Sequence, residues 1–157
     1  MKKLEFDFNG NMGGITRMFA IPENSYKRIV PDHTNKKVRL EVKNRADIID
    51  IYFIDDTDTF TEEYDNGLYK VQVSAIFPKL NRLTQHDLIK LDTENWRVLF
   101  QDNNDNIRLA GNDDYALEFR RIDTTGRISA RNQVSFTFYG AQITPCCFID
   151  LIEMDDL

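Results

Sequence analysis

The chain has 157 residues, of which 41% are hydrophobic and 29% are charged. This length fits one folded domain, and this composition supports a buried core rather than a disordered chain. The formal net charge of −6 at pH 7 argues against a nucleic-acid-binding protein, because such proteins cluster Lys and Arg against the phosphates.

The first residues, MKKLEFDFNG, predict a strand over Leu4–Phe8 and no secretion signal. Three apolar residues of this range alternate with Glu5 and Asp7, whereas a secretory signal needs an uninterrupted apolar segment. No apolar run elsewhere in the sequence approaches the roughly 20 residues that span a bilayer. We therefore expect no membrane association, and a chain that works inside a cell or within a larger assembly.

Alternation of apolar and polar residues returns along the chain and predicts further strands. Turn-forming clusters such as NGNMGG, DNG, GNDD and TTG separate these strands. Many short strands at this spacing predict a mainly β fold, an antiparallel β-sandwich or barrel, in a single domain over residues 1–157 that ends in a short, flexible, acidic C-terminal segment. The segments with this period are Ile15–Ile21, Val38–Val42, Leu68–Phe77, Tyr115–Arg121 and Val134–Gly140.

Two segments depart from this alternation. Ile48–Ile54 is almost continuously apolar, which predicts a central strand covered on both faces. Farther on, leucines at 80, 83, 88 and 91 recur on one helical face. We therefore expect one short flanking helix over about residues 85–95, with Thr84 as its cap.

Charged residues cluster in two segments that we expect to contact neighbouring subunits. Residues 55–67 are acidic and lie between two strong predicted strands, which predicts a projecting acidic loop. The segment FRRIDTTGRISARN carries several arginines, which would face that loop if copies met head to tail in a ring. Two ordinary solvated loops would explain the same pattern. The predicted contact residues are Asp55, Asp56, Asp58, Glu62, Glu63, Arg120, Arg121, Arg127 and Arg131.

The stretch WRVLFQDNNDNIRLAGN, over residues 96–112, carries the pattern most suggestive of chemistry. Interpreted as an EF-hand calcium loop that begins at Asp102, the stretch has Ile107 at the sixth position, where an EF-hand requires Gly. The residues on either side of this loop alternate like strands rather than helices. Because Asn and Asp favour tight turns, we expect a β-hairpin closed by QDNNDN. A weak cation site over Asp102–Asn106 remains an open alternative. Four side chains fall at EF-hand ligand positions: Asp102, Asn104, Asn106 and Asp113.

Other residue patterns that carry chemistry are missing from the sequence, and we predict a protein that is not an enzyme. The only histidines are His33 and His86, and the only cysteines, Cys146 and Cys147, are adjacent. This spacing fits neither a zinc site nor an unstrained disulfide, so we expect two reduced thiols. NGNMGG lacks the lysine of a phosphate-binding loop, and no nucleophile elbow is present. We therefore expect no catalytic residue, no metal or other cofactor, and no small-molecule substrate.

Several motifs occur in an order that matches a known family. NMGGITRMFAIP and LYKVQVSAIFPK precede a strand containing Trp96, a short turn and an LAG step at residues 109–111. Arg131 and Asn132 then precede the last long strand. This order, over most of residues 11–140, resembles a family of small structural proteins of tailed phages and of prophages of gut bacteria. The motifs are structural, and the resemblance carries over no catalytic residue.

The resemblance implies a virion component, of the tail or tail tube, with a β-sandwich fold, one flanking helix and packing into rings. We therefore expect a non-enzymatic structural protein that acts by self-assembly. Its expected partners are other copies of itself and other virion proteins, in the host cytoplasm during assembly and then in the virion. The alternative is a monomeric β-sandwich module, which would recognise a protein or carbohydrate ligand through its loops.

Overall fold

The fold is mainly β, a sandwich of three sheets, and the described residues contain one α-helix. The computed structural model describes residues 13–78, 82–124 and 133–154. The predictions of a mainly β sandwich with a short flanking helix are confirmed. The predicted strand over Leu4–Phe8 lies outside the described residues, as do residues 155–157 of the C-terminus, for which we expected a short, flexible, acidic segment.

The central sheet has the strand order β11–β8–β7–β1–β4, and each strand runs antiparallel to its neighbours. Its middle strand, β7, begins with five consecutive buried residues. Because alternate side chains of a strand point to opposite faces, such a strand must be covered on both sides. The strands are β1 (Ile15–Pro22), β4 (Ile49–Ile51), β7 (Trp96–Asp102), β8 (Ile107–Ala110) and β11 (Cys147–Phe148).

The outer sheet and the helix cover one face of the central sheet. The outer sheet has the order β5–β6–β10–β9, and all its strands are antiparallel. Trp96 and Val98 of β7 pack in one buried cluster with Phe136 and Phe138 of β10 and with Leu88 of the helix. The elements are β5 (Thr59–Asp65), β6 (Leu68–Phe77), α1 (Arg82–Thr93), β9 (Glu118–Thr124) and β10 (Gln133–Gln142).

The small sheet covers the opposite face of the central sheet. It has the order β12–β3–β2, and β12 runs parallel to β3. Ile21, Leu99 and Leu109 of the central sheet pack in a second buried cluster with Leu40 and Val42 of β3. The elements are β2 (Tyr26–Asp32), β3 (Lys37–Val42), the short 3₁₀ helix η1 (Arg45–Asp47) and β12 (Leu151–Met154).

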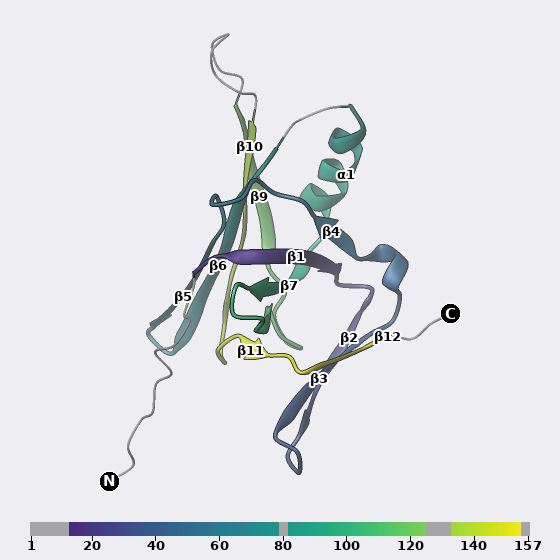
Figure 1. Cartoon of the computed structure of the whole chain (residues 1–157), viewed down its shortest axis with the longest axis vertical. Coiled ribbons are helices and arrows are strands. Elements are labelled where there is room, and N and C mark those ends of the chain that lie inside the picture. The colour runs from purple at the N-terminus through teal and green to yellow at the C-terminus, as the bar shows by residue number, and fades with distance from the viewer. Residues whose placement is uncertain (1–12, 79–81, 125–132, 155–157) are drawn as a thin grey trace.

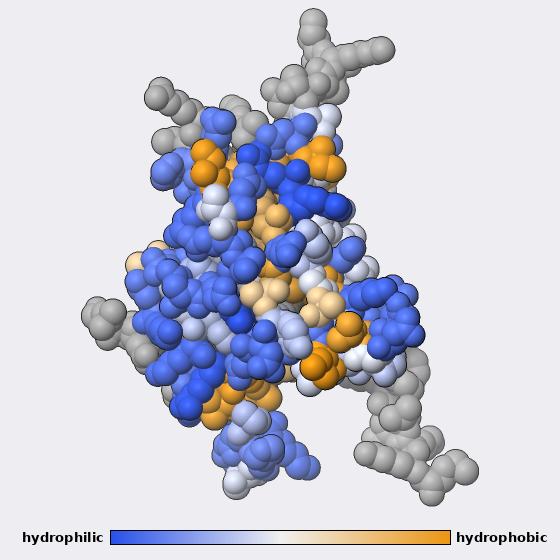
Figure 2. All heavy atoms as spheres, turned by 180° about the vertical axis from the view of Figure 1, so that it is seen from behind, coloured by the Kyte–Doolittle hydropathy of each residue, from blue (hydrophilic) through white to orange (hydrophobic). Residues whose placement is uncertain are grey.

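Figure 1 shows the arrangement of these layers, with α1 beside β9 and with β2, β3 and β12 at the end of the molecule away from the helix. The face in Figure 2 is mainly hydrophilic, and its hydrophobic residues form separate spots rather than one broad surface. Many apolar side chains of the strands are instead buried in the two clusters between the layers.

Two predicted segments differ from the structure. The prediction that Ile48–Ile54 is a central strand is wrong: the segment contributes only β4, which pairs with β1 and is the last strand of the central sheet among the described residues. The predicted projecting loop over residues 55–67 is also wrong in its main part. Thr59–Asp65 forms β5, which pairs with β6 through a two-residue turn at Asn66 and Gly67. The sequence pattern did not predict this strand, because β5 buries few apolar side chains on its inner face and so shows little alternation of apolar and polar residues.

The remaining boundaries shift by a few residues. The helix begins at Arg82 and ends at Thr93, so Thr84 lies inside it rather than at its cap. Its leucines at 88 and 91 are buried, as the helical spacing predicted. The strand predicted over Tyr115–Arg121 begins instead at Glu118. Its expected start is taken by a turn, in which the Asn112 side chain accepts hydrogen bonds from the backbone N–H groups of Asp114 and Tyr115.

Gly111, directly after β8, generates a stability prediction. Its φ is +93°, and a Cβ there would lie 2.8 Å from Cγ of the buried Arg97. We expect Gly111→Ala to lower the free energy of unfolding by roughly 2–3 kcal/mol, through backbone strain and the clash. Gly67→Ala is the matched control, because Gly67 has φ +84° and no atom within 4 Å of the added Cβ.

Urea unfolding of both variants measures the difference. For the control we expect a loss of about 1 kcal/mol, from the dihedral angle alone. Equal losses for the two glycines would show that the contact with Arg97 contributes nothing.

Candidate functional site

The predicted contact residues that the structure describes lie at or beside opposite edges of the outer sheet. Glu62 and Glu63 belong to β5, which is one edge strand, and Arg120 and Arg121 belong to β9, which is the other. Asp55, Asp56 and Asp58 precede β5 in the chain, whereas Arg127 and Arg131 lie outside the described residues. The acidic and basic groups are therefore separated by the whole width of one sheet.

The segment before β5 is a turn with one structural carboxylate. Thr57 closes the turn by donating its hydroxyl to the Ile54 carbonyl at 2.6 Å, and Asp56 adopts a φ of +63°. Asp58 accepts a hydrogen bond from the Ile15 backbone N–H at 2.5 Å and so holds the start of β1. Asp55 and Asp56 themselves are exposed.

Glu62 works inside the chain rather than on its surface. Its carboxylate accepts a hydrogen bond from the Cys146 backbone N–H at 2.6 Å and lies 3.6 Å from the Arg108 guanidinium. That guanidinium stacks between two aromatic rings, 4.6 Å from the centre of Phe60 and 4.9 Å from that of Phe148. Strands β5, β8 and β11 are thereby held together, and the Glu62 carboxylate is bound within the chain. Its neighbour Glu63 is exposed.

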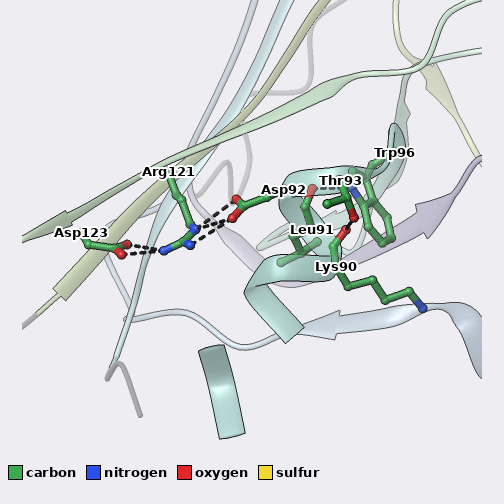
Figure 3. A network of polar contacts seen from close by, with 7 residues as sticks. All are labelled: Lys90, Leu91, Asp92, Thr93, Trp96, Arg121 and Asp123. Atoms are coloured by element: carbon green, nitrogen blue, oxygen red, sulfur yellow. Dashed lines mark hydrogen bonds and ion pairs between the residues drawn. The ribbon is translucent and has the colours of Figure 1, made fainter. Parts of the chain in front are cut away.

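Arg121 also forms its polar contacts within the chain. Figure 3 shows its guanidinium between the carboxylates of Asp92, at the end of α1, and Asp123, on β9, at 3.0 and 2.6 Å. These hydrogen bonds raise the pKa of Arg121 above its usual range. Arg121 therefore fixes the helix to β9. In the same view, the Trp96 indole N–H donates to the Leu91 carbonyl at 3.0 Å, which holds the helix end to β7.

Arg120 points to the opposite face of β9 and is exposed. Its guanidinium carbon lies 5.7 Å from the centre of the Tyr139 ring. The Tyr139 hydroxyl donates to Glu118 at 2.6 Å, and this hydrogen bond raises the pKa of Tyr139. The outer face of the sheet thus presents a polar group of Glu118, Arg120 and Tyr139 to solvent.

A buried arginine that the sequence patterns did not single out supports the small sheet. Arg97 is 4% exposed, and its guanidinium stacks 4.2 Å above the Tyr26 ring. The Tyr26 hydroxyl in turn donates to Asp113 at 2.5 Å, and burial followed by this hydrogen bond raises its pKa. Asp113, considered above as a calcium ligand, therefore anchors Tyr26. The alternation WRVLF marks Arg97 as a strand residue, and nothing local predicts its partners.

The DNNDN stretch is a turn, as the hairpin prediction stated. The Asp102 side chain accepts hydrogen bonds from the backbone N–H groups of Asn104 and Asn106, at 2.8 and 3.0 Å. Asp105 takes the left-handed conformation, with φ +62°. The Asp102 carboxylate therefore serves the turn, and no group of three or more His, Cys, Asp or Glu side chains in the described part of the chain could hold a metal ion.

A groove of about 450 Å³ lies between the central and small sheets. Its floor includes the buried Leu40 and Leu99, and its walls are apolar side chains that remain half-buried. Arg17, Arg45 and Asp50 stand around it and are exposed. The sequence patterns did not predict this groove, because it forms where two sheets meet. The half-buried wall residues are Phe19, Ile48, Ile107 and Ile152.

The chain matches no known family model, no curated protein and no solved structure in the comparisons made. Over the described residues, no helix has the length and apolar character needed to cross a membrane.

The Arg121 network predicts a measurable coupling between helix and sheet. In a double-mutant cycle with Asp92→Ala and Arg121→Ala, we expect a coupling of roughly 0.5–1 kcal/mol, because both side chains are partly exposed to solvent. Asp123→Ala provides the matched cycle, in which we expect a smaller coupling because Asp123 is more exposed and lies on the same strand. The free energies come from urea unfolding, and a coupling near zero for Asp92 would contradict the tether.

The two thiols predict a loss of stability at alkaline pH. Burial raises the pKa of both Cys146 and Cys147, and the Glu62 side chain raises that of Cys146 further. Above about pH 8.5 the unfolded chain loses these protons while the native chain keeps them. Their stabilising contribution is therefore complete below that pH and declines above it, by at most about 1.4 kcal/mol per pH unit for each thiol.

Urea unfolding from about pH 7 to about pH 9.5 measures this decline. In the double variant Cys146→Ala, Cys147→Ala we expect a flatter profile over the same range. A wild-type profile that is as flat as that of the variant would contradict the assignment.

Proposed function

We propose that this chain is a non-enzymatic structural subunit that acts by self-assembly, with edge strand β5 as its main contact. The observation that carries this proposal is the construction of the outer sheet. Its four strands pair in continuous register, without the irregularities present in β1–β7 and β2–β3. A regular edge strand presents unpaired backbone groups on which another strand can form.

The turn between β5 and β6 determines which groups of β5 face outward. Asn66 and Gly67 both have positive φ, at 51° and 84°, as in a type I′ turn. In such a hairpin the closing pair, Asp65 and Leu68, exchanges two backbone hydrogen bonds. Non-hydrogen-bonded and hydrogen-bonded pairs then alternate along the strands, so the next pair, Tyr64 and Tyr69, is not hydrogen-bonded. The backbone N–H of Tyr64 consequently points away from β6.

Charge restricts what can pair with β5. The strand TFTEEYD carries three carboxylates and no basic side chain. Glu62 pairs with Arg108 and Asp65 with Lys70 of the same chain, and Glu63 is exposed. Two β5 strands placed side by side would bring like charges together, which disfavours a symmetric dimer through this edge. A partner strand that carries arginine would instead be attracted.

The opposite edge of the same sheet fits this requirement. Because the four strands alternate in direction, β9 runs opposite to β5. A second copy placed beside the first in the same orientation would therefore bring β9 antiparallel to β5. Arg120 of that strand is exposed, and the following segment contains Arg127 and Arg131. Contacts of this head-to-tail kind produce rings or open filaments.

The more specific part of the proposal is a role in the tail of a tailed phage or prophage, with other virion proteins as further partners. It rests on the sequence resemblance described above. The burial of Trp96, Leu109 and Ala110 supports it, because these motif residues then have structural rather than catalytic reasons to be present. Assembly in the host cytoplasm and incorporation into the virion follow from the same proposal.

A monomeric binding module is the second candidate. The observation that favours it is the groove between the central and small sheets, whose volume of about 450 Å³ lies in the range of ligand sites.

The self-assembly proposal predicts that assembly requires the backbone N–H groups of β5 that point away from β6, because a strand of another copy would accept hydrogen bonds from them. Light scattering coupled to size exclusion, over a range of protein concentrations, should detect species larger than the monomer. Tyr64→Pro removes the outward N–H, and edge strands tolerate proline, so we expect assembly to weaken at least about tenfold. Tyr64→Ala is the matched control, because it removes the same side chain and keeps the N–H.

The two variants separate edge pairing from a contact made by the tyrosine ring. Equal loss of assembly in both would overturn β5 pairing through its backbone. A monomer at every concentration and salt condition would overturn self-assembly and favour the binding module.

A further inference from the structure

The groove between the central and small sheets is bordered by two edge strands. β4 is the last strand of the central sheet, and β12 is the last strand of the small sheet. Asp50 of β4 and Ile152 of β12 both line the groove, so the unpaired edges of two sheets approach the same apolar space. An extended segment placed there could bury side chains and also form backbone hydrogen bonds to an edge strand.

The side chains of the groove indicate which kind of segment fits. Its interior is apolar, so the segment needs apolar residues at every second position, all on one face. The exposed residues around it include two arginines, Arg17 and Arg45, and one carboxylate, Asp50. The excess of positive charge favours acidic residues on the face that points out of the groove.

Residues 4–8 of this chain, Leu-Glu-Phe-Asp-Phe, have this pattern. As a strand, they would direct three apolar side chains to one face and Glu5 and Asp7 to the other. We propose that the groove is a docking site for an extended segment of alternating apolar and acidic residues, and that its occupant is Leu4–Phe8 of the same chain. This proposal does not depend on self-assembly.

The start of β1 makes docking within one chain feasible. Asn103, in the β7–β8 turn, donates its side-chain amide to the Gly13 carbonyl, and its backbone N–H donates to the Gly14 carbonyl at 3.1 Å. The groove begins nearby, because Arg17 of β1 pairs with Gln101 of β7 and both line it. The chain therefore enters β1 beside one end of the groove.

The length of the connecting segment also fits. Phe8 and Gly13 are five positions apart in the chain, which allows a reach of at most about 17 Å. The intervening Asn-Gly step favours a reversal of the chain. After such a turn, residues 4–8 would run beside Arg17–Ile21, a stretch of the same length that lines the groove with Arg17, Phe19 and Ile21.

Photo-crosslinking in the full-length chain tests this proposal. p-Benzoyl-phenylalanine in place of Phe6 keeps an aromatic side chain at the centre of the segment. After irradiation of the dilute protein, we expect cross-links to Phe19, Ile48 or Ile152 within the monomer, mapped by mass spectrometry. The same group in place of Asp7, which would point out of the groove, is the matched control and should give several-fold fewer groove cross-links.

Charge reversal at the groove provides a second readout. In the Phe6-substituted chain, Arg17→Glu with Arg45→Glu should reduce the yield of groove cross-links several-fold, because it would place like charges beside Glu5 and Asp7. Lys43→Glu is the control, since Lys43 is exposed and does not line the groove.

Three results would overturn the proposal. Cross-links from position 6 that fall mainly outside the groove, or an absence of cross-links, would show that the segment does not dock there. Groove cross-links found only in covalent dimers would show that the occupant comes from a second copy. Because the expected product is a monomer, loss of self-assembly in other variants has no bearing on this outcome.

Discussion

The burial of β7 on both faces is the constraint on which the rest of the fold depends. Five successive side chains, from Trp96 to Phe100, are removed from solvent, so alternate residues need separate apolar layers. Trp96, Val98 and Phe100 belong to the cluster shared with the outer sheet and α1, whereas Leu99 belongs to the cluster shared with the small sheet. Neither covering sheet can be removed without exposing half of this strand.

Arginines stabilise the contacts between these layers at three places. Arg108 connects β8 to β5 and β11 through an ion pair and two aromatic rings, and Arg121 connects β9 to α1. Arg97, on the middle strand, supports Tyr26 of the small sheet. The guanidiniums of Arg97 and Arg121 each have several polar partners, which offset the cost of removing a charge from water, whereas the buried Nε of Arg108 has no hydrogen-bond partner. The apolar clusters supply the bulk of the burial, and these polar contacts determine how neighbouring elements are oriented.

The two surfaces that we propose as contact sites, the β5 edge and the apolar groove, lie at the edges of the sheets. The outer sheet ends at an acidic, regular strand, and its width separates that strand from the arginines of β9. The central and small sheets end side by side, and the apolar groove lies between their last strands. Within the part of the chain that the structure describes, both features are sheet edges whose outward backbone groups have no neighbouring strand, and both favour extended partners. The proposed self-assembly and the proposed segment docking thus depend on the same property of a layered β fold.

The sequence by itself determined the local structure of this protein. Alternation predicted β1, β3, β6 and β10, the leucine spacing predicted the buried face of α1, and Asn and Asp in DNNDN predicted the β7–β8 turn. These features depend on neighbours within a few residues, which a single sequence displays. Only the tertiary structure decided that Ile49–Ile51 is an edge strand, that Glu62 and Arg121 bind within the chain, and that a groove forms. The physical reason is that strand order, ion-pair partners and the space between sheets depend on contacts between distant segments, such as Glu62 with Cys146 and Arg121 with Asp92, which local periodicity does not encode.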